Sequence, residues 1–260
     1  MTLTDSERVL LESKARLSRL ETVRLARIAG AGHYTSAFSA AELFAVLYYR
    51  QLRIDPKNPH WPERDRFILS KGHAAIGLYP LLADIGFFEP ALLDNYTRMG
   101  SAFGDHPDMR KIPGIDFSSG SLGHGLSVGL GMALAARLAG SDYQTWVMVG
   151  DGELAEGQIW EAIMAASHFQ VANLICLVDR NQLSIDGNTE DVMAVEPLAE
   201  RFDAFGWSAE RIDGHDLDEI SHAFARIDRR MVGRGAVVAT HLRVPGTKYR
   251  ALVGVQSRSF

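Results

Sequence analysis

The sequence predicts an α/β fold in which a doubly wound, mostly parallel sheet carries helices on both faces. The strand-like runs are short and almost continuously apolar, as expected for strands that are buried on both sides. Stretches with apolar residues at helical spacing separate these runs, which is the pattern of strand–helix–strand units. No linker rich in Ser, Pro or Gly divides the 260 residues, so we expect a single domain over residues 1–260.

The helices are predicted from the spacing of apolar residues. Within residues 1–30, Val9, Leu17 and Ile28 belong to a helically spaced apolar series among Glu and Arg residues. This pattern predicts an amphipathic N-terminal helix over residues 5–29 rather than an export signal. Further helical patterns cover residues 39–51, 122–139, 154–168, 195–205 and 216–229.

The strands are predicted from apolar runs that lie between the helical patterns. These runs are Phe67–Leu69, Thr145–Val149, Leu174–Asp179, Ser208–Ile212 and Ala236–Thr240. Residues 52–66 and 98–121 combine Pro or Gly with polar groups and predict long ordered loops, which commonly bind ligands. Residues 246–260 predict an irregular tail.

Composition argues against two classes of partner. The net charge is −5 without a block of like charges, so nucleic acid is not an expected partner. No stretch reaches transmembrane length, so no membrane partner is expected. The one cysteine, Cys176, lies in an apolar run and is interpreted as a small buried hydrophobe. These features suit a cytoplasmic location.

The ends of two predicted strands carry the residues of greatest chemical interest. Gly150-Asp151-Gly152 follows one strand, and Asn181 follows the next strand along the chain. Because the carboxyl ends of strands in an open parallel sheet border the ligand crevice, Asp151 and Asn181 are expected to lie together. Their oxygens and the backbone carbonyl of Leu183 suit Mg²⁺ or Ca²⁺. The glycines allow N–H groups to approach a phosphate, so the pattern predicts a metal-bridged diphosphate site. Taken alone, Gly-Asp-Gly is more often an ordinary turn.

A glycine-rich run, Gly120-Ser-Leu-Gly123-His-Gly125-Leu-Ser-Val-Gly129, lies at the start of a predicted helix. No clear strand precedes it, and its spacing does not match a dinucleotide-binding fingerprint. Close helix packing through small residues and a ligand-contacting loop are both open interpretations. The two are compatible because the loop precedes the helix.

Four histidines, His33, His73, His106 and His124, stand beside or near glycine at the expected ends of elements. A single histidine in such a setting is usually an ordinary turn residue. Four of them predict a polar pocket suited to hydroxylated or phosphorylated substrates. Zinc is a rival use, but no pair shows the short spacing of zinc ligands.

Taken together, these segments resemble the N-terminal part of transketolase, a thiamine-diphosphate enzyme. Gly150-Asp151-Gly152 through Asn181 resembles its cofactor motif, and Leu69-Ser-Lys-Gly-His73 resembles its Leu-Ser-x-Gly-His segment. Gly32-His33 resembles its first signature, and the glycine-rich run resembles its Gly-x-Leu-Gly-Gln-Gly-Leu-Ser loop. The similarity runs over about residues 15–245, with the motifs in the family's order.

The resemblance implies a thiamine-diphosphate-binding fold of the diphosphate (PP) type and a role for each matching residue. The metal ligands would be Asp151, Asn181 and the carbonyl of Leu183. His33, His73 and His106 would be catalytic, and His33 and His106 would face the sugar. Glu156 and Glu161 would lie near an inter-subunit carboxylate network. The cofactor would contact His73, Gly120, Ser121, Leu122, Asp151, Gly152, Glu153, Asn181 and Leu183.

The resemblance covers only the half of transketolase that binds the diphosphate. It therefore implies the N-terminal subunit of a split transketolase, a thiamine-diphosphate-dependent transferase. Such an enzyme moves a two-carbon ketol unit from a ketose phosphate or another α-hydroxyketone to an aldehyde. A separate C-terminal subunit would supply the pyrimidine-binding half, in an α₂β₂ heterotetramer. Two alternatives remain open: a subunit that decarboxylates and ligates 2-keto acids, and a non-catalytic cofactor-binding partner.

Four features depart from the family pattern. Tyr34 replaces a smaller or aliphatic residue, Asp105 replaces a glycine, and His124 stands where glutamine is common. After Thr240, no residue matches the family's Trp-His pair, whose histidine contacts the cofactor. These departures bear on the choice of acceptor and on activity itself.

Overall fold

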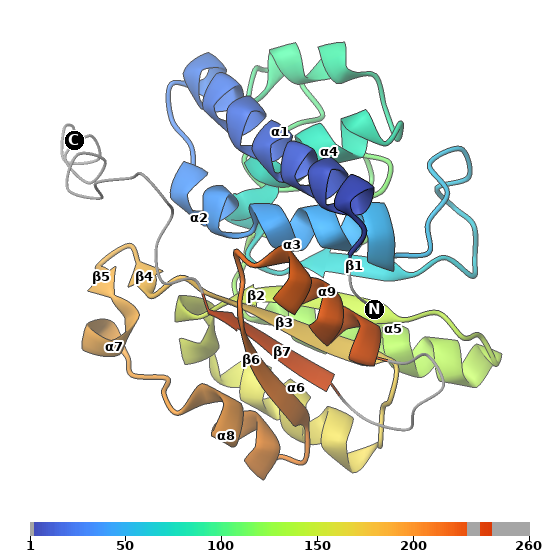
Figure 1. Cartoon of the computed structure of the whole chain (residues 1–260), viewed down its shortest axis with the longest axis vertical. Coiled ribbons are helices and arrows are strands. Elements are labelled where there is room, and N and C mark those ends of the chain that lie inside the picture. Colours follow the sequence, from blue (N-terminus) through green and yellow to red (C-terminus); the bar gives the residue numbers. More distant parts are fainter. Residues whose placement is uncertain (1–2, 228–234, 241–260) are drawn as a thin grey trace.

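The computed structural model describes residues 3–227 and the backbone of residues 235–240. At its centre lies a five-stranded sheet in the order β1-β2-β3-β7-β6, in which every neighbouring pair is parallel (Figure 1). The register aligns Gly150 with Asp179, so β2 and β3 end beside each other. The strands are β1 (Arg66–Leu69), β2 (Thr145–Gly150), β3 (Leu174–Arg180), β6 (Ser208–Asp213) and β7 (Gly235–Thr240).

Helices cover both faces of this sheet, and Figure 1 shows the strands between two helical layers. The first layer comprises α1 (Asp5–Ala29), α2 (Tyr34–Ser39), α3 (Ala41–Val46), the π-helical turn η1 (Leu47–Gln51), α4 (Ala75–Asp84) and α9 (Leu217–Arg226). The second layer comprises α5 (His124–Ala139), α6 (Gly157–His168) and α8 (Leu198–Ala204).

Alternate side chains of the strands enter two separate apolar cores. Trp146 and Met148 of β2 join the core on the α1 side, whereas Val147 and Val149 join the core on the α5 side. The side chains of β3 alternate in the same way. Because the side chains on both faces are apolar, each strand is an almost continuous apolar run, which is the pattern that predicted the parallel sheet.

Short elements surround the carboxyl ends of the strands. The single turns η2 (Gly72–Ala74) and η4 (Gly152–Ala155) follow β1 and β2. After β3, a hairpin of β4 (Leu183–Ser184) and β5 (Gly187–Asn188) leads into α7 (Thr189–Val192). A further 3₁₀ segment, η3 (Pro90–Asn95), lies beyond α4. Three strands therefore end in turns and loops whose polar groups are available to form a site.

Most of the predicted elements are confirmed. All five strands occur where expected, and the first helix spans residues 5–29. The expected helix over residues 39–51 begins earlier, at Tyr34, and is divided into α2, α3 and η1. The pattern over residues 154–168 is divided between η4 and α6. Residues 52–65 and 98–121 contain no helix or strand, as predicted, whereas the predicted tail, residues 246–260, lies outside the described residues.

Two α-helices, α4 and the single turn α7, have no counterpart among the predicted elements, and α4 is the longer of them. Its residues from Ala75 to Ala83 are all buried, so no polar face alternates with an apolar one. A helix that is buried all round shows no amphipathic period. Pro80 in its interior weakens the helical signal further.

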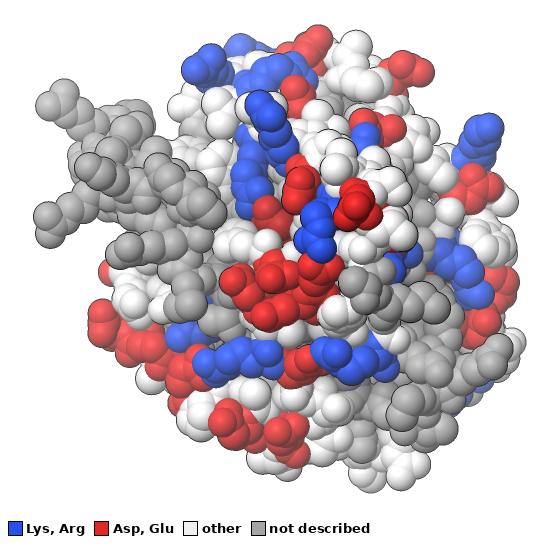
Figure 2. All heavy atoms as spheres, in the orientation of Figure 1, with Lys and Arg blue, Asp and Glu red and all other residues white. Residues whose placement is uncertain are grey.

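The surface carries charges of both signs. On the face shown in Figure 2, Lys and Arg side chains alternate with Asp and Glu side chains. Ion pairs such as Arg8–Asp218 and Arg19–Glu42, each with a 2.5 Å separation, join side chains of opposite sign from different helices. Among the described helices, none combines the length and the apolar character that a bilayer-spanning helix needs.

The glycines of α5 bring this helix close to the sheet. A Cβ atom at Gly129 would lie 2.4 Å from Cγ2 of Val147 in β2, and one at Gly125 would lie 2.4 Å from the Ser70 side chain. The packing interpretation of the glycine-rich run is therefore confirmed for its helical part. Gly131, in the same helix, faces open space.

Gly129→Ala is expected to lower the free energy of unfolding by about 1–3 kcal/mol, because the added methyl group overpacks the contact with Val147. The matched substitution Gly131→Ala is expected to raise it by about 0.5–1 kcal/mol, because alanine favours a helix where space is available. Urea denaturation followed by circular dichroism measures both values. Equal effects of the two substitutions would contradict this account of α5.

Candidate functional site at the carboxyl edge of the sheet

Three carboxylates, Asp151, Glu153 and Asp179, are buried at the edge where β1, β2 and β3 end. Their residues expose 1%, 3% and 0% of their surface, respectively. Burial of an ionised carboxylate is costly unless donors or cations compensate for the lost water. The partners of each carboxylate therefore define the chemistry of this edge.

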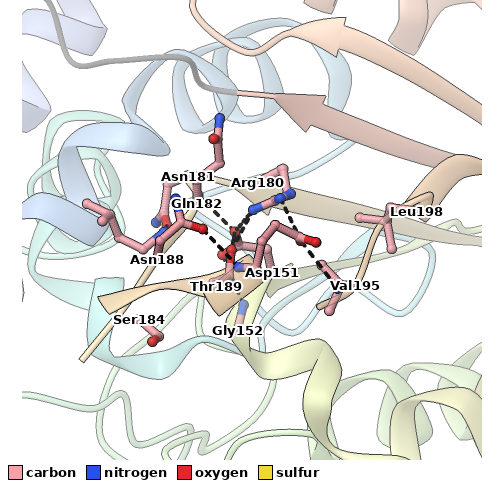
Figure 3. A network of polar contacts seen from close by, with 12 residues as sticks. Asp151, Gly152, Arg180, Asn181, Gln182, Ser184, Asn188, Thr189, Val195 and Leu198 are labelled. Atoms are coloured by element: carbon pink, nitrogen blue, oxygen red, sulfur yellow. Dashed lines mark hydrogen bonds and ion pairs between the residues drawn. The ribbon is translucent and has the colours of Figure 1, made fainter. Parts of the chain in front are cut away.

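Asp151 is held on both of its oxygens (Figure 3). Oδ1 accepts a hydrogen bond from the Gly152 N–H at 2.9 Å. Oδ2 accepts the Gln182 N–H at 2.8 Å and contacts Arg180 Nη1 at 2.6 Å. The Thr189 hydroxyl donates to the same oxygen at 3.1 Å. Burial raises the pKa of Asp151, and the hydrogen bond from Arg180 opposes that rise.

Arg180, at the end of β3, is a site residue that the sequence patterns did not predict. Its side chain is 4% exposed and also contacts Glu190 at 2.8 Å and Glu196 at 3.3 Å. Its Nη1 donates to the Thr189 hydroxyl at 2.6 Å. Its position in the sequence could have identified it, because a charged residue at the end of a buried strand needs partners.

Glu153 joins three segments of the chain. Its Oε1 accepts hydrogen bonds from the Ser70 hydroxyl and from the Gly123 N–H, the latter at 2.8 Å. Its Oε2 accepts the Gly150 N–H at 3.0 Å. Burial raises the pKa of Glu153, and these hydrogen bonds oppose the rise. The side chain thereby fixes the glycine-rich loop against the ends of β1 and β2.

Asp179 pairs with Lys71, and both side chains are buried. The Ser39 hydroxyl donates to the same carboxylate at 2.6 Å, which ties α2 to the end of β3. Lys71 also affects its neighbour: burial, followed by the Lys71 charge, lowers the pKa of His73 to about 3. His73 is therefore a neutral imidazole at neutral pH, able both to donate and to accept a hydrogen bond.

The three histidines predicted to be catalytic lie close to one another. The rings of His33 and His73 have centroids 5.1 Å apart. The carboxylate of Asp105 lies between His33 and His106. Its Oδ2 is 3.6 Å from His33 Nε2 and 3.9 Å from His106 Nδ1. A Cβ at Gly120 would lie 3.4 Å from the His106 ring, so this histidine borders the glycine-rich loop. His124, the fourth histidine of the predicted pocket, is instead exposed at the start of α5.

The remaining predicted residues have polar groups or surfaces that a ligand can reach. Ser121 and Leu122 are exposed in the loop that Ser119 anchors, through its hydroxyl, to the Leu69 carbonyl at 2.6 Å. Asn181 is half-buried, and its Oδ1 accepts the N–H of the exposed Leu183 at 2.9 Å. These two residues therefore form one tight turn beside Asp151.

The donor set at this turn fits a hard divalent cation. One carboxylate, one amide oxygen and one backbone carbonyl are the ligand types that Mg²⁺ and Ca²⁺ accept. Asp151 Oδ1 accepts the Gly152 N–H and has capacity to accept more. No group of three or more His, Cys, Asp or Glu residues suited to a metal occurs in the described part of the chain. Among the described residues, a cation here would therefore be held by one carboxylate together with neutral oxygens.

The chain is similar to known proteins along most of its length. Residues 12–241 match the family described as "Transketolase, thiamine diphosphate binding domain". The 6-deoxy-6-sulfo-D-fructose transketolase subunit of Clostridium sp. (strain MSTE9) is 40% identical over 243 residues, which cover 94% of this chain and 88% of that protein. An apulose-4-phosphate transketolase subunit of Phocaeicola vulgatus is 40% identical, with 84% of this chain and 77% of that protein covered.

Full transketolases are also similar, but the chain spans a smaller part of them. Human transketolase is 35% identical over 95% of this chain and 38% of its own length. The crystal structure of the transketolase mutant R525L from Pichia stipitis superposes with a TM-score of 0.86 and 31% identity, over 92% of this chain and 37% of that one.

The chain belongs to the transketolase family and contains its thiamine diphosphate-binding domain. The predicted family, the α/β fold and the transketolase-type transferase class are confirmed. The extent of the chain matches relatives that are themselves named as transketolase subunits, as expected for the N-terminal subunit of a split enzyme. The roles of individual site residues stay predictions.

Glu153→Ala is expected to lower the free energy of unfolding by about 2–4 kcal/mol, because donors from three segments lose their acceptor. Glu156→Ala is the matched control, since Glu156 is exposed in the same turn and should change stability by less than about 0.5 kcal/mol. Thermal and urea denaturation of the full chain measure both effects. A Glu153→Ala variant as stable as the Glu156→Ala variant would refute the conclusion that Glu153 holds these three segments together.

Proposed function

We propose that this chain is the metal- and diphosphate-binding subunit of a two-subunit transketolase. The enzyme transfers a two-carbon ketol unit from a ketose phosphate or another α-hydroxyketone to an aldehyde. The observation that carries the proposal is the placement of Asp151 and the Asn181 turn at one edge of the sheet, beside the glycine-rich loop and the histidines. Thiamine diphosphate, when bound, supplies the electron sink for breaking the carbon–carbon bond.

The residues beside Asp151 hold the charged end of the cofactor. Asp151, Asn181 and the carbonyl of Leu183 are the ligands for Mg²⁺, with Ca²⁺ as the alternative ion. The N–H groups that begin at Gly152 suit a phosphate, because the backbone can approach closely at a glycine. The cofactor can also contact the exposed loop formed by Gly120, Ser121 and Leu122. Glu153 acts on this site chiefly by holding the loop in place.

The histidines orient the sugar. His73, neutral because burial lowers its pKa, exchanges hydrogen bonds without introducing a positive charge near the cofactor. His33 and His106 face the substrate hydroxyls, where ring N–H groups stabilise charge that develops on oxygen. Asp105 lies between these two rings, near enough to each for an electrostatic contact.

The second half of the site comes from a partner. We assign this role to a separate C-terminal subunit that binds the aminopyrimidine, in an α₂β₂ assembly with the cofactor at the interface. Two findings support this assignment: similar proteins of comparable length are named as subunits, and this chain spans only 38% of human transketolase. Glu156 and Glu161 are exposed on one end of α6 and are available to such a partner.

Asp151→Asn is expected to weaken Mg²⁺-dependent binding of thiamine diphosphate by about 100-fold or more, because the proposed metal ligand that carries a negative charge in this chain becomes neutral. Titration calorimetry on the full chain, co-purified with the C-terminal subunit, measures this loss. Asp186→Ala, in the exposed tip of the β4–β5 hairpin, is the control and should bind normally.

The same complex tests the reaction. Wild type is expected to consume a ketose donor in the presence of an aldehyde and to leave pyruvate unchanged, as measured by mass spectrometry. Normal cofactor affinity in Asp151→Asn would contradict the proposed site. Turnover of pyruvate instead of the ketose would favour the 2-keto acid reaction, and binding without turnover would favour a non-catalytic role.

A further inference from the structure

Arg180 places a positive charge directly on the carboxylate that would bind the metal. Its Nη1 lies 2.6 Å from Asp151 Oδ2, and both side chains are almost fully buried. Coulomb interactions are strong at such a distance and away from water. Arg180 therefore offsets part of the negative charge that Asp151 contributes to the metal ligands.

Arg180 is fixed in this position by partners on its other nitrogens. Nη2 contacts Glu190 at 2.8 Å, and Nε contacts Glu196 at 3.3 Å. The Thr189 hydroxyl accepts from Nη1 at 2.6 Å. Figure 3 shows the guanidinium pointing at Asp151 from the end of β3. A side chain held by so many groups cannot leave readily when a cation arrives.

The two oxygens of Asp151 consequently differ in their remaining capacity to bind a ligand. Oδ2 is occupied by Arg180, Gln182 and Thr189. Oδ1, which accepts the Gly152 N–H, is the oxygen with capacity left for a metal ion. The arrangement thus offers one carboxylate oxygen and two neutral oxygens, with a fixed cation behind them.

Resting on the proposed function, we propose that Arg180 is a positioning residue that makes divalent-metal binding depend on the diphosphate. Affinity for a divalent ion rises with the negative charge of its ligands. Because Arg180 offsets part of the Asp151 charge, this carboxylate attracts a cation less strongly than an unpaired one would, whereas a diphosphate supplies several anionic oxygens. The metal therefore binds with the diphosphate rather than before it.

The test measures metal binding rather than catalysis. Mn²⁺ bound to the full chain is quantified by equilibrium dialysis at matched free Mn²⁺, with and without inorganic pyrophosphate. In the wild type, pyrophosphate is expected to raise Mn²⁺ affinity by at least about tenfold. If Mn²⁺ binds equally well without pyrophosphate, the proposal is overturned whatever the variants show.

Arg180→Gln removes the charge while keeping a hydrogen-bonding side chain. It is expected to tighten the binding of Mn²⁺ alone by about tenfold and to reduce the effect of pyrophosphate. Arg211→Gln is the matched control, because Arg211 pairs at 2.7 Å with the other carboxylate oxygen of the same Glu196. It should behave like the wild type. Arg180→Lys, which keeps the charge, should retain the dependence on pyrophosphate.

The outcomes separate this inference from the proposed function. If Mn²⁺ binds to the wild type with pyrophosphate but Arg180→Gln, folded by circular dichroism, shows unchanged affinities, Arg180 has only a structural role and the inference fails. If the folded wild type binds no Mn²⁺ even with pyrophosphate, the proposed metal site itself fails, and the inference fails with it.

Discussion

Burial of three carboxylates at the carboxyl edge of the sheet is the constraint on which the rest of the site depends. Asp151, Glu153 and Asp179 lose their hydration when the chain folds, and that cost is of several kcal/mol per charge unless partners replace the water. The partners come from elsewhere in the chain: from the residue after β1, from the glycine-rich loop, from α2 and from the end of β3. The carboxylates are satisfied only when these segments meet in register.

This constraint connects the fold with the proposed chemistry. The parallel register of β2 and β3 brings Asp151 beside the Asn181 turn, and Glu153 secures the loop that would border the cofactor. Two cations, Lys71 and Arg180, pair with Asp179 and Asp151, so they offset part of the negative charge at this edge. Such an edge is suited to taking up a cation and an anion together, which agrees with the coupling inferred for Arg180.

Much of the fold was predictable because its signals are local. Apolar runs that are buried on both faces identified the strands, and the rule that parallel strands end at a common edge placed Asp151 and Asn181 together. The helix α4 was not predictable in this way, because its residues are buried on every side and the amphipathic signal disappears. Its position depends on packing against α1 and the loops around it.

The roles of the charged residues were harder to predict, because they depend on partners far along the chain. Glu153, interpreted locally, is an acid that favours a helix dipole, yet its hydroxyl partner, Ser70, lies 83 residues away. Lys71 and Asp179 are 108 residues apart. Arg180 adjoins the predicted ligand Asn181, but its contact with Asp151 depends on the pairing of two strands. Sequence patterns locate such residues without revealing which charge each one compensates.

The most direct test of the central claim is a crystal structure of the full chain with its C-terminal partner, thiamine diphosphate and Mn²⁺, collected at a wavelength where manganese scatters anomalously. The account predicts one anomalous peak bound by Asp151 Oδ1, the Asn181 side chain and the Leu183 carbonyl, in contact with the diphosphate. A diphosphate bound elsewhere, or a manganese peak that Asp151 does not touch, would contradict it.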